Sequence, residues 1–302
     1  MKLLQFVQEK FWITPLIGLL LGLTFPSLGQ KLSGVIVPAV MIMFFSTCLK
    51  IDFIEVLSHI KKPLFLFYLS IMYLLVIPAI LYGMFQFVNP ELALAILLLA
   101  SICPGASAPV LTDIFKGNTT LSMAISLITY VASPFTVVLL FLIFTQRVIT
   151  IDLYSLFKSL LLINVLPLLA AQLIRKTFKD FVERTKKHYS LVNIFLIGFI
   201  IYIVVAIQAN EILQNPLNTF VNIVWLYLLF FILFIAGYFI AFWRKRSDKI
   251  AIAITKTYMN NTVTIAMALT FFGPKIALLM VLSEVPWGTT LGLFKYLLKY
   301  LP

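Results

Sequence analysis

Residues 91–116 read ELALAILLLASICPGASAPVLTDIFK, an apolar run with the interruption CPGASAP. Pro104 lacks a backbone N–H and clashes with the preceding turn, Gly105 loosens the chain, and Pro109 suits the first turn of a new helix. We therefore expect a helix that breaks at Pro104 and restarts near Ser107. Such a break leaves unpaired amides and carbonyls, which a membrane tolerates only around a cavity. A simple proline kink is the structural alternative.

The composition indicates a membrane protein. The 302 residues are 62% apolar and 11% charged, and one soluble core does not shelter that many apolar residues. The apolar residues form long runs, and a helix needs about 20 of them to cross a bilayer. Lipid selects helices because they satisfy their own backbone polar groups. We predict an all-α integral membrane protein that binds no nucleic acid, since the basic residues form no mixed basic and aromatic surface.

Ten apolar runs predict ten transmembrane helices in one polytopic unit, residues 1–302. The first run extends from Phe11 to Gly29, and no small-residue cleavage pattern follows it, so we interpret it as a helix rather than a signal peptide. The predicted helices are 11–29, 32–54, 63–87, 91–116, 119–145, 151–174, 190–209, 218–243, 249–272 and 275–300.

The basic residues divide unequally between the two sides that ten helices create. Lys31, Arg147 and Lys275 lie on one side, and Lys158 and Lys256 lie within helices. Because loops rich in Lys and Arg stay in the cytoplasm, we predict a multi-pass protein of the inner (plasma) membrane with both termini cytoplasmic. The cytoplasmic side then has Lys2, Lys10, Lys50, Lys61, Lys62, Lys116, Arg175, Lys176, Lys179, Arg184, Lys186, Lys187, Arg244, Lys245, Arg246, Lys249, Lys295 and Lys299.

A second polar interruption, KTYMNNT at residues 256–262, lies in the ninth predicted helix, at the place that matches the first. Five helices per half, with both termini on one side, give two halves of opposite orientation, which is the inverted-repeat plan. Phe115-Lys116-Gly117 and Phe271-Phe272-Gly273 follow the two interruptions at an offset of 156 residues. We predict two inverted five-helix repeats, residues 1–148 and 149–302, with broken helices four and nine.

Polar residues at the two breaks form the predicted substrate site. Asn260 and Asn261 do not suit lipid-facing positions, although amides that only join two helices are the alternative. Half-helices that begin near Ser107 and Thr262 direct positive dipole ends to one site, which suits a carboxylate. We therefore expect a small organic anion as the substrate. The expected binding residues are Gly105, Ala106, Ser107, Asn260, Asn261 and Thr262, and the hydroxyls of Ser122, Ser126 and Thr129 either face the same cavity or pack between helices.

Four short motifs together have the order and spacing of a known family. They are Val37-Pro38-Ala39-Val40-Met41 running to Leu49-Lys50, Ser101-Ile102-Cys103-Pro104-Gly105, Lys116-Gly117-Asn118 leading into Leu121-Ser122, and Met259-Asn260-Asn261 in place of Met-Gln-Asn. Through them nearly the whole chain resembles the bile acid:sodium symporter superfamily of organic-anion transporters. The resemblance implies that helices four and nine cross at their breaks. It also implies that a core of helices three to five and eight to ten moves against a panel of helices one, two, six and seven.

The chain departs from this superfamily at its sodium ligands. Sodium-coupled members have a glutamate four residues before the Gln of Met-Gln-Asn, and this chain has Lys256 there. Their Ser-Asn pair after Cys-Pro-Gly corresponds to Ala108-Pro109, and their glutamine before the helix-three proline corresponds to Tyr73. Ser122 and Ser126 still match hydroxyl positions. The resemblance therefore puts sodium in doubt, and we expect no other cofactor and no metal site.

Lys256 offers an attached positive charge in place of a bound sodium ion. We expect it near the carbonyl end of a first half-helix and the asparagine pair, which would make transport sodium-independent. A desolvated lysine also releases its proton more readily, so proton coupling with Glu284 or Asp113 as a partner is a second hypothesis. The structural alternative is a side chain that reaches toward the cytoplasm, seven residues beyond Lys249.

Other functions fit the pattern less well. We predict no enzyme activity, because His59 and His188 fall in cytoplasmic loops and Asp113 and Glu284 lack a protease signature. Arsenite efflux on a related fold, with Cys103 as a thiolate, is the runner-up among transporters, although the missing acid in helix nine argues against it. A sodium- or proton-coupled bile acid or organic acid symporter and a membrane solute sensor stay open. We favour a small acid such as pantoate, pyruvate or another 2-keto or hydroxy acid, because a bile acid needs a larger apolar cavity.

Overall fold

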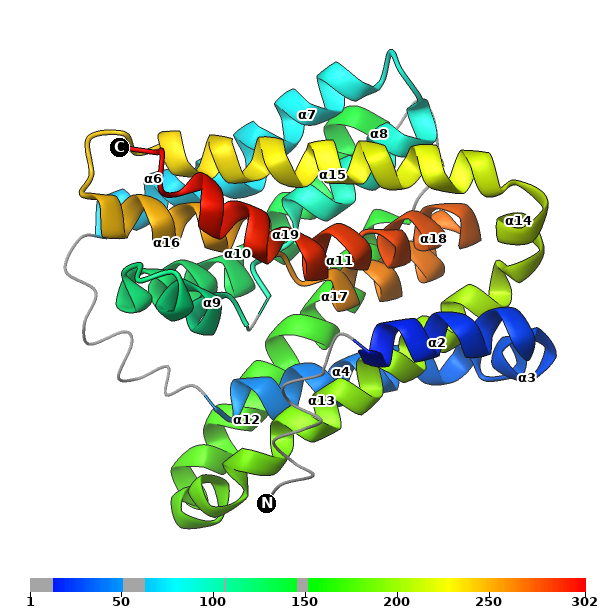
Figure 1. The fold of residues 1–302 in the computed structure, drawn as a ribbon. Coiled ribbons are helices and arrows are strands. Elements are labelled where there is room, and N and C mark those ends of the chain that lie inside the picture. The colour runs from blue at the N-terminus through cyan, green and yellow to red at the C-terminus, as the bar shows by residue number, and fades with distance from the viewer. Residues whose placement is uncertain (1–12, 51–62, 106, 146–151) are drawn as a thin grey trace.

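The computed structural model describes residues 13–50, 63–105, 107–145 and 152–302, and every regular element among them is helical (Figure 1). The first half of the chain forms α2 (Ile13–Thr24), α3 (Pro26–Lys31), α4 (Ile36–Cys48), α6 (Pro63–Ile71), α7 (Ile77–Phe85), α8 (Pro90–Ser101), α9 (Ala108–Ile114) and α10 (Thr119–Thr145). The second half forms α11 (Leu153–Leu160), α12 (Leu166–Thr177), α13 (Lys179–Ile207), α14 (Ala209–Gln214), α15 (Pro216–Phe239), α16 (Arg246–Thr257), α17 (Asn261–Met267), α18 (Pro274–Leu282) and α19 (Glu284–Leu297). A 3-10 turn, η1 (Ser33–Val35), precedes α4, and the π-helical segments are η2 (Met72–Val76), η3 (Leu161–Val165) and η4 (Ala268–Phe272).

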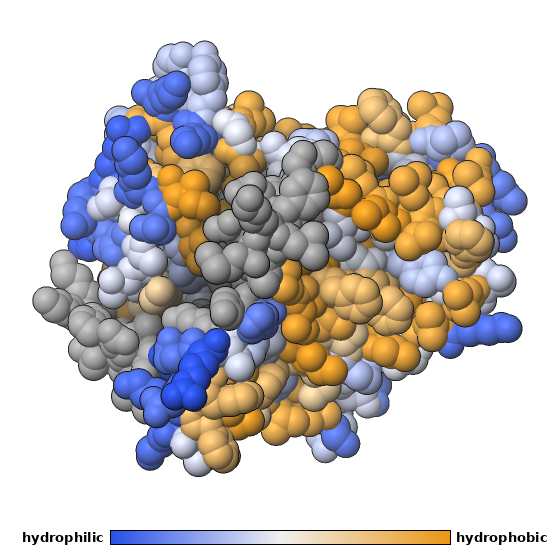
Figure 2. Space-filling view, turned by 60° about the horizontal axis from the view of Figure 1, so that its bottom comes forward, coloured by the Kyte–Doolittle hydropathy of each residue, from blue (hydrophilic) through white to orange (hydrophobic). Residues whose placement is uncertain are grey.

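The length and composition of the helices suit a membrane. Within the described ranges, five helices are long and apolar enough to cross a bilayer, namely Pro63–Phe85, Thr119–Phe144, Leu153–Thr177, Pro216–Phe239 and Pro274–Leu297. Four shorter apolar helices accompany them, Ser33–Cys48, Pro90–Ser101, Leu191–Ile207 and Asn261–Phe272. Figure 2 shows hydrophobic residues across the middle of one face and hydrophilic residues gathered at its left end. The prediction of an all-α, multi-pass membrane protein is confirmed at this level.

The helices form two groups that are separated in Figure 1. The lower layer consists of α2, α3, α4, α12 and α13, and α2 packs along α13. These two helices can approach closely because Gly18 has no Cβ atom, which would otherwise overlap the carbonyl oxygen of Gly198. Small residues at such contacts are typical of helix pairs in membranes. The upper group contains α6 to α9 and α15 to α19, and α10 packs against α9 and α16 as well as α11.

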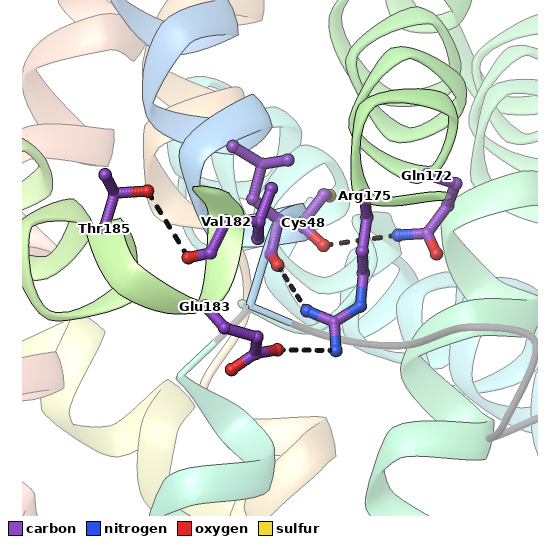
Figure 3. A network of polar contacts seen from close by, with 7 residues as sticks. Cys48, Gln172, Arg175, Val182, Glu183 and Thr185 are labelled. Carbon is purple, nitrogen blue, oxygen red and sulfur yellow. Dashed lines mark hydrogen bonds and ion pairs between the residues drawn. The ribbon is translucent and has the colours of Figure 1, made fainter. Parts of the chain in front are cut away.

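Polar side chains of α12 and α13 hold the C-terminal end of α4 (Figure 3). Gln172 Nε2 donates to the carbonyl oxygen of Cys48 at 3.3 Å, and Arg175 Nη1 donates to that of Leu49 at 3.0 Å. The Arg175 guanidinium also pairs with Glu183 at 2.9 Å. A positive charge at this position satisfies carbonyls that the helix leaves unpaired and complements the helix dipole. The lower layer is therefore joined at this end by polar contacts as well as by packing.

Basic residues lie at the helix ends on both the left and the right of Figure 1. Figure 1 places the end of α12 and the starts of α13 and α16 at the left, and α3, α14 and α18 at the right. The basic residues of the left group include Arg175 and Lys176 at the end of α12 and Lys249 near the start of α16. Lys31 ends α3, and Lys275 lies in the first turn of α18.

Three local features differ from the predicted helix boundaries. Helix α13 begins at Lys179 rather than at residue 190, because the Lys, Arg and Glu side chains of this stretch favour helix and extend it beyond the apolar part. The first and last predicted helices are divided, at Phe25 and at Ser283. The expected residues 51–54 of helix two lie outside the described residues.

Candidate functional site

The two predicted helix breaks lie against each other and are joined by backbone hydrogen bonds. Gly105 N–H donates to the Tyr258 carbonyl at 2.8 Å, and Asn260 N–H donates to the Cys103 carbonyl at 3.0 Å. The two bonds are equivalent, because Cys103 and Gly105 of the first break have the same roles as Tyr258 and Asn260 of the second. Gly105 allows this approach, since a Cβ atom there would lie 3.1 Å from the Met259 carbonyl oxygen. The two breaks are therefore paired in antiparallel directions at Pro104 and Met259.

After each break, the helix resumes within one residue of the predicted position. Ser107 precedes the first residue of α9, and Pro109 lies in its first turn. Asn260 is the N-cap of α17 and accepts a hydrogen bond from Val263 N–H through its side chain at 3.4 Å. This bond satisfies one of the amides that a helix start leaves unpaired. The predicted site residue Ala106 lies outside the described residues.

Lys256 is almost completely buried at this crossing, with 2% of its surface exposed. Its Nζ atom donates to two carbonyl oxygens, those of Tyr73 and Ala100, each at 2.7 Å. The same atom lies 5.4 Å from the centre of the Tyr73 ring, which adds a cation–π contact. The side chain therefore does not reach toward the cytoplasm. It is fixed between the third helix and the end of the first half of the fourth.

Prolines explain why these two carbonyls are available. Ala100 would accept from the residue four positions on, which is Pro104 and has no N–H. In the π-helical turn η2, Ile77 N–H donates to the Met72 carbonyl rather than to that of Tyr73. The next residue that could donate to Tyr73 is Pro78, which again has no N–H. The Lys256 ammonium group thus satisfies two acceptors that the backbone leaves unpaired.

Tyr73 also holds the ninth helix through its phenol group. The hydroxyl donates to the Ile252 carbonyl and lies 3.0 Å from Thr255 Oγ1. Tyr73 therefore contacts the first half of the ninth helix at its backbone, at a threonine and at Lys256. This residue occupies the position where the resemblance expects a sodium-ligating glutamine.

A second buried polar cluster lies beside the start of α17. Asn261 Nδ2 donates to Ser283 Oγ at 2.9 Å, and Ser283 Oγ donates to the Met280 carbonyl at 2.6 Å. Asn261 also neighbours the carboxyl group of Glu284. In the part of the chain that the structure describes, Asn261 Oδ1 and Glu284 Oε1 are buried and have no hydrogen-bond partner. The kink between α18 and α19 therefore brings Ser283 and Glu284 to the predicted site.

The remaining predicted residues lie near the crossing or away from it. Thr262 is buried, and its Oγ1 lies 4.0 Å from Met43 Sδ of α4 in the lower layer. Asp113 is exposed on α9, and no ion pair between described residues joins it, or Glu284, to Lys256. The hydroxyls of Ser126 and Thr129 donate to carbonyls of their own helix, and Ser122 accepts from Thr112 at 3.1 Å.

The sequence placed Lys256 near the carbonyl end of the first half of helix four, where Ala100 lies, but did not indicate its second acceptor, Tyr73. The positions of Pro78 and Pro104 are the signal that could have indicated free carbonyls at Tyr73 and Ala100. The π-helical segments η2, η3 and η4 each end two residues before a proline, namely Pro78, Pro167 and Pro274, so Pro78 marks the π-helical turn as well. Nothing in the local sequence pairs Ser283 with Asn261, which lies 22 residues earlier.

Comparisons with known proteins agree with this architecture. The profile of the Sodium Bile acid symporter family matches residues 37–215. A Bacillus subtilis (strain 168) protein called "Uncharacterized sodium-dependent transporter YocS" is 27% identical over 221 residues, which cover 72% of this chain and 69% of that protein. Both comparisons indicate transporters rather than enzymes. Because the profile matches more than half of the residues, the chain belongs to the Sodium Bile acid symporter family.

Proposed function

We propose that this protein is a secondary transporter of small organic anions that works by alternating access without sodium, because Lys256 replaces the bound ion. The observation that carries this proposal is the pair of 2.7 Å hydrogen bonds from Lys256 Nζ to Tyr73 and Ala100. These bonds place a positive charge on carbonyl oxygens at the crossing of the two broken helices. Carbonyl oxygens are the kind of ligand that coordinates an alkali cation.

Lys256 performs the electrostatic role of such a cation but cannot dissociate with the substrate. A mobile sodium ion contributes its own gradient to transport, whereas a covalently attached ammonium group contributes only charge and structure. The proposed protein therefore draws no energy from sodium. This distinguishes it from the "sodium-dependent" property in the name of the Bacillus subtilis relative.

The chemistry around the crossing supports an anionic substrate. Lys256 supplies a positive charge when protonated, and the N-terminus of the helix Asn261–Phe272 supplies the positive end of a dipole. Asn261 and Thr262 lie in the first turn of this helix, and Ser107 precedes α9. We assign these residues and the Gly105 region to recognition of a carboxylate. The small size of this group of helix ends favours a small acid over a bile acid.

The two groups of helices supply the parts for alternating access. In this proposal the lower layer is the panel, and the upper group with α10 is the core that moves against it. The two backbone bonds between the breaks are equivalent, with Cys103 corresponding to Tyr258 and Gly105 to Asn260. This symmetry supports a ten-helix inverted repeat. Thr262 near Met43 of α4 marks a place where the core meets the panel.

A ligand screen tests the proposal. We would measure the melting temperature of the purified protein with pyruvate, pantoate and other 2-keto and hydroxy acids, in sodium chloride and in choline chloride. A bound ligand raises the melting temperature by mass action, so we expect at least one anion to stabilise the protein equally in both salts. Asn261→Ala and Ser107→Ala should lose this response, whereas Asn218→Ala, an exposed asparagine on α15, should keep it. Stabilisation that requires sodium would contradict the proposal, as would normal responses in both site variants.

A further inference from the structure

Two buried acceptor oxygens lie unpaired beside the start of α17. They are Asn261 Oδ1 and Glu284 Oε1, and the two side chains are neighbours. The Asn261 amide nitrogen donates to Ser283 and cannot pair two acceptors with each other. A proton on Glu284 turns the carboxylate into a hydroxyl donor, for which Asn261 Oδ1 is the adjacent free acceptor. One proton would therefore satisfy both oxygens.

The charges at the crossing indicate when this proton is needed. With Glu284 ionised, its negative charge would offset the positive charge of Lys256 in the protein without anion. A monovalent anion would add a second negative charge in a setting where unbalanced charge is costly. Lys256 has two carbonyl partners and does not pair with Glu284. Protonation of Glu284 restores neutrality when the anion is bound.

The helices that pack against α18 and α19 offer Glu284 no other charge partner in the described residues. α16 and its break bring Lys256 and Tyr258, whose hydroxyl lies 3.2 Å from Thr290. Tyr227 of α15 contacts Thr289, and Tyr202 of α13 donates to the Phe25 carbonyl. On α8, Glu91 pairs at 3.6 Å with Lys275, which lies in the first turn of α18. Asn261 is the polar neighbour of the Glu284 carboxyl group.

We propose that Glu284 binds one proton together with each anion, so that the protein is a proton–anion symporter; this inference rests on the proposed function. On one side of the membrane the proton passes from water to a carboxylate oxygen of Glu284 as the anion binds. On the other side the O–H bond breaks, and the proton returns to water as the anion leaves. One proton and one monovalent anion cross per cycle, so no net charge moves.

Linkage gives the sign of the pH effect. A bound anion makes Glu284 a stronger proton acceptor, so anion binding takes up a proton and binding tightens as the pH falls. Over the range in which Glu284 is ionised without anion and protonated with it, the affinity changes about tenfold per pH unit. Glu284→Gln is neutral at every pH and presents an N–H donor to Asn261 Oδ1. At every pH, the affinity of the Glu284→Gln protein for the anion should stay near the affinity that the unaltered protein has at low pH.

Binding calorimetry in choline buffers tests this inference, with pyruvate and pantoate as probes over a range of pH. The unaltered protein should bind more tightly at lower pH and take up one proton per anion, which weakly buffered solutions report directly. Glu284→Gln should bind without pH dependence and take up no proton, while Glu284→Asp and the control Glu91→Gln should keep both effects. A pH-independent affinity in the unaltered protein, or an unchanged pH slope in Glu284→Gln, overturns the role of Glu284.

Further outcomes separate this inference from the proposed function. If neither probe nor any other screened anion binds at any pH, the proposed function fails and Glu284 has no anion to accompany. If anions bind in choline without proton uptake, the proposed function survives and this inference fails. Tight, pH-independent binding of a zwitterion such as alanine would also overturn it, because the substrate would then bring its own positive charge. If Glu284→Gln does not fold, proton uptake by the unaltered protein and by Glu284→Asp decides the question.

Discussion

Proline spacing determines where Lys256 can bind. Pro78 and Pro104 each remove one N–H donor, and the carbonyls that lose a partner, those of Tyr73 and Ala100, point to one ammonium group. The sequence indicated that Lys256 and the break at Pro104 belong together, and the structure places both at the crossing. It did not indicate the helix-three acceptor, because the sequence analysis did not predict the π-helical turn η2 that leaves the Tyr73 carbonyl without a backbone donor.

Asp248 is a second single residue whose contribution to the stability of the fold can be tested. Its carboxylate is fully buried, accepts from Arg244 Nε at 2.9 Å and pairs with Arg244 Nη2 at 2.6 Å. It also accepts from Asn118 Nδ2 at 2.8 Å. Asp248→Ala leaves these donors without their acceptor, so we expect the free energy of unfolding to fall by about 3–5 kcal/mol.

The exposed pair Glu91–Lys275 is the matched control for Asp248. The Glu91 side chain is 57% exposed in this pair, and exposed ion pairs contribute about 1 kcal/mol or less. Glu91→Gln should therefore shift the unfolding transition in detergent much less than Asp248→Ala. Equal shifts for the two variants would show that the Asp248 cluster contributes no more than a surface ion pair.

The broken helices were the most predictable elements. Pro104, Gly105 and Pro109 predicted the first break directly, and the polar run at Asn260 predicted the second. The long α13 was predicted too short, since its first part, which starts at Lys179, is rich in charged residues and so does not form part of an apolar run. The division at Ser283 was not predicted, although Pro286 follows three residues later and leaves the Leu282 carbonyl without its helical N–H donor.

Close packing of α15 on α16 positions Lys256, and this contact can be tested. A Cβ atom on Gly237 would lie 2.9 Å from Ala253 Cα and 3.0 Å from Lys256 Cβ. We expect Gly237→Val to push α16 away, to lower the melting temperature and to weaken stabilisation by the anion. The control is Gly292→Val, because no atom lies within 4 Å of the corresponding position on Gly292. A Gly237→Val protein that melts and responds like the control would argue against this role of the packing.

The whole molecule combines membership of a transporter family with a buried lysine where its two helix breaks meet. The family profile ends at residue 215, before the ninth helix, so family membership does not depend on Lys256. Two of the departures that the resemblance implies, Lys256 and Tyr73, contact each other. In the proposed mechanism these residues keep the crossing charged and closed while the core moves against the panel. The sequence predicted an all-helical membrane protein, but the packing of the lower layer follows from close contacts such as that of Gly18 with Gly198.

The central claim is that Lys256 replaces sodium, and uptake into proteoliposomes tests it most directly. The measurement compares entry of an anion that stabilises the protein, with sodium or with choline as the only external cation, for the unaltered protein, Lys256→Met and the exposed-lysine control Lys275→Met. We expect equal uptake in both salts for the unaltered protein and for Lys275→Met, and a loss of about tenfold or more for folded Lys256→Met, because the buried charge is gone. Uptake that requires sodium in the unaltered protein, or normal uptake by Lys256→Met, would contradict the claim.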